Sequence, residues 1–352
     1  MKNKDIVKGY RKYTCRKAYW SLFLVFLLFV IAIYSLSVGS MHLPAGKIIN
    51  TFLRPVEKIN EVVIWNIRFP RIFAAVIAGM GLAVAGCVMQ SVLKNPLASP
   101  FTMGISQGAA FGAAFAIIVL GLGMQGINSS SIFNSPYVVT IFAFLGSLIG
   151  IVIILLLARF TGLSPEAMIL AGIAMGTLFS SGTMFLQYFA DDVEVASVVF
   201  WTFGDIGRVG KKDIAVMSLV TIPALLYFIS KRWDYNVLAS GDETAKALGV
   251  NTEQLRFVGI LVSALITSVA VAFLGIIGFI GLVSPHIVRR VIGGDHRFLI
   301  PASAIFGGIL LLLADTLSRT IMSPIVLPVG ILTSFMGVPL FIYLILKRSK
   351  QY

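Results

Sequence analysis

The chain has 352 residues, of which 58% are hydrophobic and only 12% are charged, and its mean hydropathy is +0.94. This composition excludes an ordinary soluble domain, in which about a quarter of the residues are charged. The formal net charge of +13 could indicate a nucleic-acid-binding protein, but such a protein needs basic residues on a folded polar surface, for which this sequence has little material. We therefore interpret residues 1–352 as one membrane domain with no nucleic-acid partner.

Apolar runs recur along the whole chain. A helix that spans a bilayer needs about 20 mainly apolar residues, and we count about ten such runs between residues 20 and 347. If the N-terminus lies inside, almost all of the excess Lys and Arg falls on cytoplasmic segments, as the positive-inside rule requires. The prediction is an all-α, polytopic protein of the cytoplasmic (inner) membrane, with both termini in the cytoplasm.

The N-terminal residues 1–19 form a basic tail ahead of the apolar run 22–36. A cleaved signal peptide would show the same order of features, and the small residues at 37–40 could form its cleavage site. The run is nearly long enough to span a membrane, so we predict an uncleaved first helix. External loops are predicted at 42–64 and 121–135, and an internal turn at 159–164.

Small residues mark the faces where helices are expected to touch. Gly104, Gly108 and Gly112 repeat at intervals of four in the third run, and alanines and glycines fill the run that follows Pro70. Small side chains allow close contact in lipid, where no hydrophobic effect drives helices together. These two runs are therefore predicted to pack closely against neighbours.

Two segments depart from a simple spanning helix. Residues 193–203 are apolar but too short to cross, which suggests a half-helix that lies against the bundle or lines a cavity. Residues 275–281, with three glycines, break a helix inside the apolar zone. Open backbone is not stable in lipid, so this break must be buried in protein or face a water-filled path.

A polar island at residues 240–250 separates the sixth and seventh runs. Ser240 with Glu243 has the form of a capping box, and Lys246 could pair with Glu243 on one helical face. Gly249 can end that helix in a left-handed conformation, and Asn251 resembles a second N-cap. The prediction is two short helices that meet at Gly249. The island could be an ordinary solvated turn or a docking element.

Three arginines stand out on the external side, where positive charge is otherwise scarce: Arg68, Arg71 and Arg319. They could form a basic contact for an acidic soluble partner. Alternatively they could reach the phosphates of lipid headgroups, and Arg319 could be neutralised by Asp315 four residues earlier.

No catalytic motif is present in the sequence. There is no Gly-x-x-x-x-Gly-Lys-Ser/Thr motif for binding ATP, no His, Cys or carboxylate cluster with metal-ligand spacing, and no legible nucleophile and base. Cys15 and Cys87 form no recognisable pair. The chain is predicted not to be an enzyme and to hold neither cofactor nor metal.

An ordered series of short motifs resembles the permease family of ATP-binding-cassette (ABC) importers for iron–siderophore complexes, haem and cobalamin, the FecCD type. The resemblance covers residues 65–343. The matching stretches are Arg68-Phe69-Pro70-Arg71, Gln90 with Asn95-Pro96-Leu97-Ala98, Gly104-Ile105-Ser106-Gln107-Gly108-Ala109, Trp201-Thr202-Phe203-Gly204, residues 241–250, residues 278–286, Gly294-Asp295-His296-Arg297, Asp315-Thr316 and Pro328-Val329-Gly330.

The resemblance implies a homodimer of ten-span subunits with the fold of a cobalamin-importer permease and a substrate path at the dimer interface. It also implies two separate ATPase subunits and an extracytoplasmic substrate-binding protein, which would meet Arg68, Arg71 and Arg319. Residues 240–254 correspond to the cytoplasmic coupling loop. The residues that match its contact with the ATPase are Gly241, Asp242, Glu243, Ala245, Lys246, Leu248 and Gly249.

One departure from the family pattern is Val326, which stands where members often have a glutamate between two prolines. Any role of that acid is absent or moved here. The run 201–205 varies among members, so the cargo stays open. The competing class is an ion-coupled secondary transporter, which would require ionisable residues near the bilayer midplane, and the predicted spans offer few.

Overall fold

The computed structural model describes residues 2–39, 62–121, 137–160 and 164–349. Within these ranges every regular element is a helix. Most of the two predicted external loops and the centre of the internal turn at 159–164 lie outside the described residues. The helices are α1 (Lys2–Ser37), η1 (Val63–Arg68), α4 (Phe69–Val92), α5 (Ile105–Ala114), η2 (Phe115–Val119), α6 (Tyr137–Phe160), α7 (Pro165–Tyr188), α8 (Asp192–Thr202), η3 (Ile206–Arg208), α9 (Lys211–Ser230), α10 (Arg232–Leu238), α11 (Asp242–Ala247), α12 (Thr252–Leu274), α13 (Ile280–Ile292), α14 (His296–Thr320) and α15 (Val329–Ser349).

The helices confirm the predicted all-α, multi-pass membrane fold, although not all of them are full-length spans. Within the described residues, seven helices are long and apolar enough to cross a membrane. Two shorter apolar helices, Ile105–Val119 and Val329–Tyr343, occupy the third and tenth predicted positions. The eighth position is taken by α13, whose 13 residues reach about 20 Å at 1.5 Å per residue, less than the core of a bilayer.

Helix α4 is the centre of the bundle, in contact with α9, α12, α13 and α14. Its small residues make this possible, because the backbones touch where side chains are missing. A Cβ atom on Gly79 would overlap the carbonyl oxygen of Gly307 in α14, and one on Gly86 would overlap that of Gly281 in α13. The predicted close packing of this run is confirmed.

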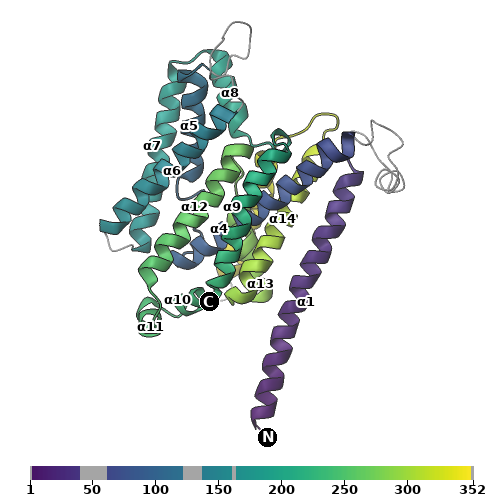
Figure 1. Cartoon of the computed structure of the whole chain (residues 1–352), viewed down its shortest axis with the longest axis vertical. Coiled ribbons are helices and arrows are strands. Elements are labelled where there is room, and N and C mark those ends of the chain that lie inside the picture. The colour runs from purple at the N-terminus through teal and green to yellow at the C-terminus, as the bar shows by residue number, and fades with distance from the viewer. Residues whose placement is uncertain (1, 40–61, 122–136, 161–163, 350–352) are drawn as a thin grey trace.

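A second group consists of α5, α6 and α7, which lie together in Figure 1 and are joined to the centre mainly by α12. A Cβ on Gly108 would come 2.6 Å from the carbonyl oxygen of Gly146, and one on Gly112 would overlap that of Phe142. Gly104 also packs closely, but against α7 and not on the face of the other two glycines, since a Cβ there would lie 2.9 Å from Gly176 N. It is the N-cap of α5, with a left-handed φ of 72°.

Both predicted irregular segments are present. Helix α8 is the half-helix, and α12 stops at Gly275 before α13 starts at Ile280. The break between them is covered by protein, as predicted, because Asp205 N donates to Leu274 O at 2.7 Å and a Cβ on Gly330 would lie 2.5 Å from Ile276 O. The segment before α9 and the start of α15 thus bury the open backbone.

The short helices α10 and α11 lie at the same end of the bundle as the N-terminal end of α1 (Figure 1). Helix α8 lies at the opposite end. Helix α1 runs along one side, where it packs mainly against α14. The bundle therefore presents two distinct ends, and each carries polar residues that the sequence singled out.

We expect Gly86→Ala to destabilise the protein by about 1–3 kcal/mol, the usual cost of overpacking, because the new methyl group meets backbone that cannot turn away. The melting temperature in detergent measures the effect. Gly294→Ala is the matched control, since nothing lies within 4 Å of a Cβ at that position. Equal melting temperatures for the two variants would contradict the close contact of α4 with α13.

Candidate functional site

The polar island forms one short helix, α11, directly after another, α10. The predicted capping box is wrong, because α11 begins one residue later than expected. Its N-cap is Gly241, with φ 115° and no side-chain cap, while the amide of Ser240 still belongs to the end of α10. The capping-box pattern alone cannot show that the amide of Ser240 is already bonded to the end of α10, which shifts the N-cap to Gly241.

The end of α11 follows the prediction more closely. Gly249 is left-handed, with φ 84°, and its N–H donates to Lys246 O while that of Val250 donates to Ala245 O. These two bonds form a Schellman motif. The Asn251 side chain accepts from Gln254 N, so the predicted N-cap is confirmed, but it starts the long helix α12. The prediction of a second short helix after Gly249 is therefore wrong, because α11 meets a long helix there, and the other short helix, α10, precedes α11.

A charged clamp holds α11 to the bundle. The Nη2 atom of Arg256 donates to both carboxylate oxygens of Asp242 at 2.7 and 2.6 Å, and Lys94 Nζ lies 2.9 Å from the same carboxylate. Arg256 is buried in α12, and its Nε donates to Val92 O at 3.1 Å. Asp242 thus ties α11 to the C-terminal end of α4 and to the first turns of α12.

The clamp keeps Asp242 ionised. Partial burial raises the pKa of its carboxyl group, but hydrogen bonds from Arg256 and Lys94 outweigh that effect and leave the pKa below its ordinary value of 3.8. Because the folded-state pKa is the lower one, the clamp contributes fully above the unfolded pKa, and the contribution is lost as the pH falls through the folded pKa.

The seven residues predicted to contact an ATPase divide into two groups. Asp242 and Ala245 point inward as anchors, and Gly241 is half-buried. The outward group comprises Glu243, Lys246, Leu248 and Gly249, and Leu248 is 66% exposed. The predicted pair of Glu243 with Lys246 is replaced by a looser one, since Lys246 Nζ lies 3.9 Å from Glu253 Oε1.

Helix α10 is fixed to α14 and α4 by a second polar network. Asn236 donates to Asp295 at 2.9 Å and accepts from His296 N at 2.8 Å, and the His296 ring lies 2.6 Å from Ser91 Oγ. Burial raises the pKa of Asp295, but hydrogen bonds from Arg297 and Asn236 bring it down to about 2. The sequence singled out residues 294–297 without assigning this role.

The N-terminal part of α1 joins the same network. Arg297 donates to Tyr10 Oη at 2.9 Å, and its guanidinium lies over the ring of Trp233 with 4.6 Å to the centroid. This contact fixes the start of α1 beside α10. It could not be read from the sequence, because Tyr10 and Arg297 are separated by almost the whole chain.

The external arginines meet at the opposite end of the bundle. Arg71 Nε lies 2.6 Å and Arg319 Nε 3.1 Å from the buried carboxylate of Asp315, so the alternative partner considered for Arg319 is present. Arg319 also donates to Val38 O at 3.0 Å and to Ser35 Oγ at 2.7 Å.

All three arginine side chains are turned inward. Arg68 donates to Leu36 O, so Arg68 and Arg319 together occupy carbonyl groups at the end of α1, where cations are favoured. Only 4% of Arg68 and 8% of Arg319 are exposed, and Arg71 exposes 12% of its side chain. A partner could reach Arg71 most easily.

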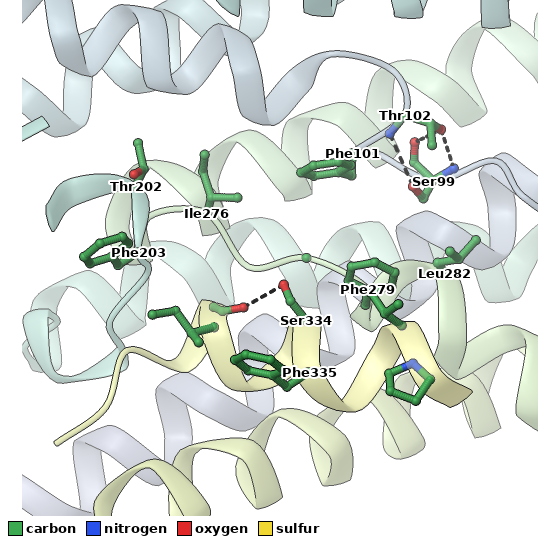
Figure 2. A pocket seen from close by; sticks show the side chains of 15 residues that line it. Ser99, Phe101, Thr102, Thr202, Phe203, Ile276, Phe279, Leu282, Ser334 and Phe335 are labelled. Carbon is green, nitrogen blue, oxygen red and sulfur yellow. Dashed lines mark hydrogen bonds between the residues drawn. The ribbon is translucent and has the colours of Figure 1, made fainter. Parts of the chain in front are cut away.

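A large hollow of about 680 Å³ opens beside the break between α12 and α13 (Figure 2). Backbone and side chains of the break reach it at Ile276, Gly278 and Phe279, and α15 contributes Ser334 and Phe335. No charged residue within the described ranges lines it. The part of the chain that the structure describes also contains no group of three or more His, Cys, Asp or Glu residues that could hold a metal.

A many-helix membrane body with a hollow among its helices and two polar ends is typical of proteins that pass a solute across a membrane. The FecCD transport family matches residues 27–347, and the chain belongs to that family. It is a permease subunit of the ABC importer type, and nothing supports the ion-coupled alternative.

The relatives agree with this class. An ABC transporter permease protein of Methanocaldococcus jannaschii is 59% identical over 99% of both chains. The hemin transport system permease of Yersinia pestis is 37% identical over 94% of this chain and 96% of its own. A solved metal-chelate type ABC transporter in an inward-facing conformation is 30% identical, with a TM-score of 0.81 over 93% of this chain and 98% of that one.

We expect Asp242→Asn to loosen α11 at neutral pH, because the buried guanidinium of Arg256 then lacks its counter-charge. The cost is about 1–3 kcal/mol, which makes hydrogen exchange of the amides at 242–250 faster by roughly fivefold or more. Glu243→Gln, at an exposed neighbouring position, serves as the control. Similar protection in the two variants would show that the clamp does not hold the helix.

Proposed function

We propose that this chain forms the membrane pathway of an importer that carries an intact metal chelate, haem or corrinoid into the cytoplasm. The uncharged hollow carries the cargo proposal. Its walls offer no charged or metal-binding side chain among the described residues, so they suit a metal that is already enclosed by its own ligand. The hemin permease of Yersinia pestis and the metal-chelate type transporter are similar to this chain.

We propose that two ATPase subunits dock on the end of the bundle that carries α10 and α11, and that this end faces the cytoplasm with both chain termini. The outward residues Glu243, Lys246, Leu248 and Gly249 and the half-exposed ring of Trp233 form the contact. An exposed leucine and tryptophan beside charged residues are typical of a protein interface.

The proposed contact surface is coupled to the hollow through the two helices that α11 contacts, α4 and α12. The Asp242 clamp grips α4 and α12 near their cytoplasmic ends. The chain that follows α4 leads to residues 99–102, and α12 ends at the break. Residues of both the 99–102 segment and the break line the hollow. A displacement of α11 by the ATPase would therefore reach both walls, and each partner would shift access by binding one state better.

Glu243→Gln combined with Leu248→Asn should weaken ATPase binding at least about tenfold, because the change removes a charge and an apolar anchor from the contact. Titration of the purified permease in nanodiscs with the ATPase measures this loss. Lys212→Gln, exposed at the start of α9 on the opposite end, is the control. Retention of normal ATPase binding and uptake by the double variant would place the docking site elsewhere.

We propose that an extracytoplasmic substrate-binding protein docks on the opposite end, around Arg68, Arg71 and Arg319. Arg71 and Arg319 meet the carboxylates of Asp205 and Asp315 there, and the Arg68 side chain lies next to that of Arg319 at the end of α1. Among the described residues, the buried Arg71 Nη2 atom has no hydrogen-bond partner and lies 3.6 Å from Asp205, whose side chain is 42% exposed and is the part of this pair that a partner would displace. An acidic side chain of the partner could take over this loose contact.

Arg71→Gln should weaken capture of the binding protein by about tenfold, whereas Arg71→Lys, which keeps the charge, should retain most of it. Surface-immobilised permease and a dilution series of the binding protein give the two affinities. Melting temperatures show whether either change disturbs the fold. If both variants are equally folded and capture the partner as the parent does, Arg71 is not part of the contact.

We propose that a second copy of the chain completes the pathway. Helices α7 and α15 expose large apolar side chains such as Leu170, Phe185 and Phe335, at 67%, 66% and 73%. The same two helices line the hollows of the molecule. A second copy against them would close these hollows on the side that a single chain leaves open.

A further inference from the structure

Two separate hollows meet at one aromatic side chain. The hollow of about 680 Å³ described above lies beside the break, and a second, of about 550 Å³, lies between α5, α7 and the turn that follows α4. The residues that line both are Phe101 and Thr102. Since the second hollow also touches Asn95 and Leu97, it lies on the side where α4 ends, next to the Asp242 clamp.

Both hollows are mainly apolar. Aromatic rings of Phe203, Phe279 and Phe335 surround the first, with hydroxyl groups only at its serines and threonines. The second has aliphatic side chains together with amide and hydroxyl groups on Asn95, Gln107, Thr177 and Ser180, and within the described residues Gln107 Oε1 is buried without a hydrogen-bond partner. A solute that moves from the first hollow to the second passes Phe101.

A rigid turn carries Phe101. Ser99 and Thr102 exchange hydrogen bonds, with Ser99 N to Thr102 Oγ1 at 3.0 Å and Thr102 N to Ser99 Oγ at 3.3 Å, and Thr102 Oγ1 donates to Ser99 O at 2.8 Å. Figure 2 shows these bonds on one side of the turn, with the Phe101 ring in the space between them and Ile276. The ring itself is nearly half exposed, at 45%.

We propose that Phe101 is the filter of the pathway, a residue that separates the apolar hollow beside the break from the second hollow. The inference rests on the proposed transport function, and it adds which solutes pass. A hydrated ion or small polar solute must lose water against the ring, which is costly. A bulky chelate with an aromatic or alkyl face replaces those water contacts with the ring and can displace it.

Removal of the ring tests the filter. Purified permease with its ATPase is reconstituted into vesicles loaded with radiolabelled sucrose, a polar solute with no aromatic or alkyl face, and sucrose efflux without ATP is recorded. Phe101→Ala should raise the leak at least about tenfold, a barrier lower by about 1.4 kcal/mol. Phe101→Leu, which keeps apolar bulk, should stay within about twofold of the parent. Phe335→Ala is the control, because Phe335 lines only the apolar hollow.

Equal leaks from vesicles with Phe101→Ala and Phe335→Ala would overturn the filter, provided both elute and melt like the parent. A parent chain that binds no ATPase would instead contradict the proposed function, and the two failures are thus distinguishable. An ATPase rate unchanged in Phe101→Ala, together with the increased leak, would support a filter that acts on the solute and not on coupling.

Discussion

Backbone polar groups inside a membrane need partners within the protein, and this constraint accounts for the arrangement around the break between α12 and α13. The break leaves peptide groups outside any helix at membrane depth. Residues 203–205 and the start of α15 fold over it, with Asp205 N bonded to Leu274 O and Gly330 N bonded to Phe203 O. These segments also form part of the wall of the apolar hollow, so the same packing covers the open backbone and shapes the hollow.

Helix α4 connects the two polar ends and the hollow. Gly79 and Gly86 allow its backbone to touch α14 and α13, so the three helices form one packed unit. Arg71 near its start holds Asp315, and Val92 at its end accepts a hydrogen bond from Arg256. A single helix thus connects the arginine cluster with the Asp242 clamp at the other end of the bundle.

The sequence could predict what depends on neighbouring residues or on a general constraint. The left-handed Gly249, the N-cap at Asn251 and the covered break were all confirmed. Pairings between distant positions could not be read, such as Asp242 with Lys94 or Arg319 with Ser35. Arg68, Arg71 and Arg319 show this limit, because charge counting predicts the side of the membrane on which they lie but not the direction of their side chains.

Helix α1 illustrates what such distant pairings demand during synthesis. Its two ends are tied by Arg297 to Tyr10 and by Arg319 to Ser35, and both arginines belong to α14. A ribosome makes α14 long after α1, so the first helix enters the bilayer before either of its ties exists. It must therefore remain stable in lipid alone, and its many exposed apolar side chains give it that stability before α14 is made.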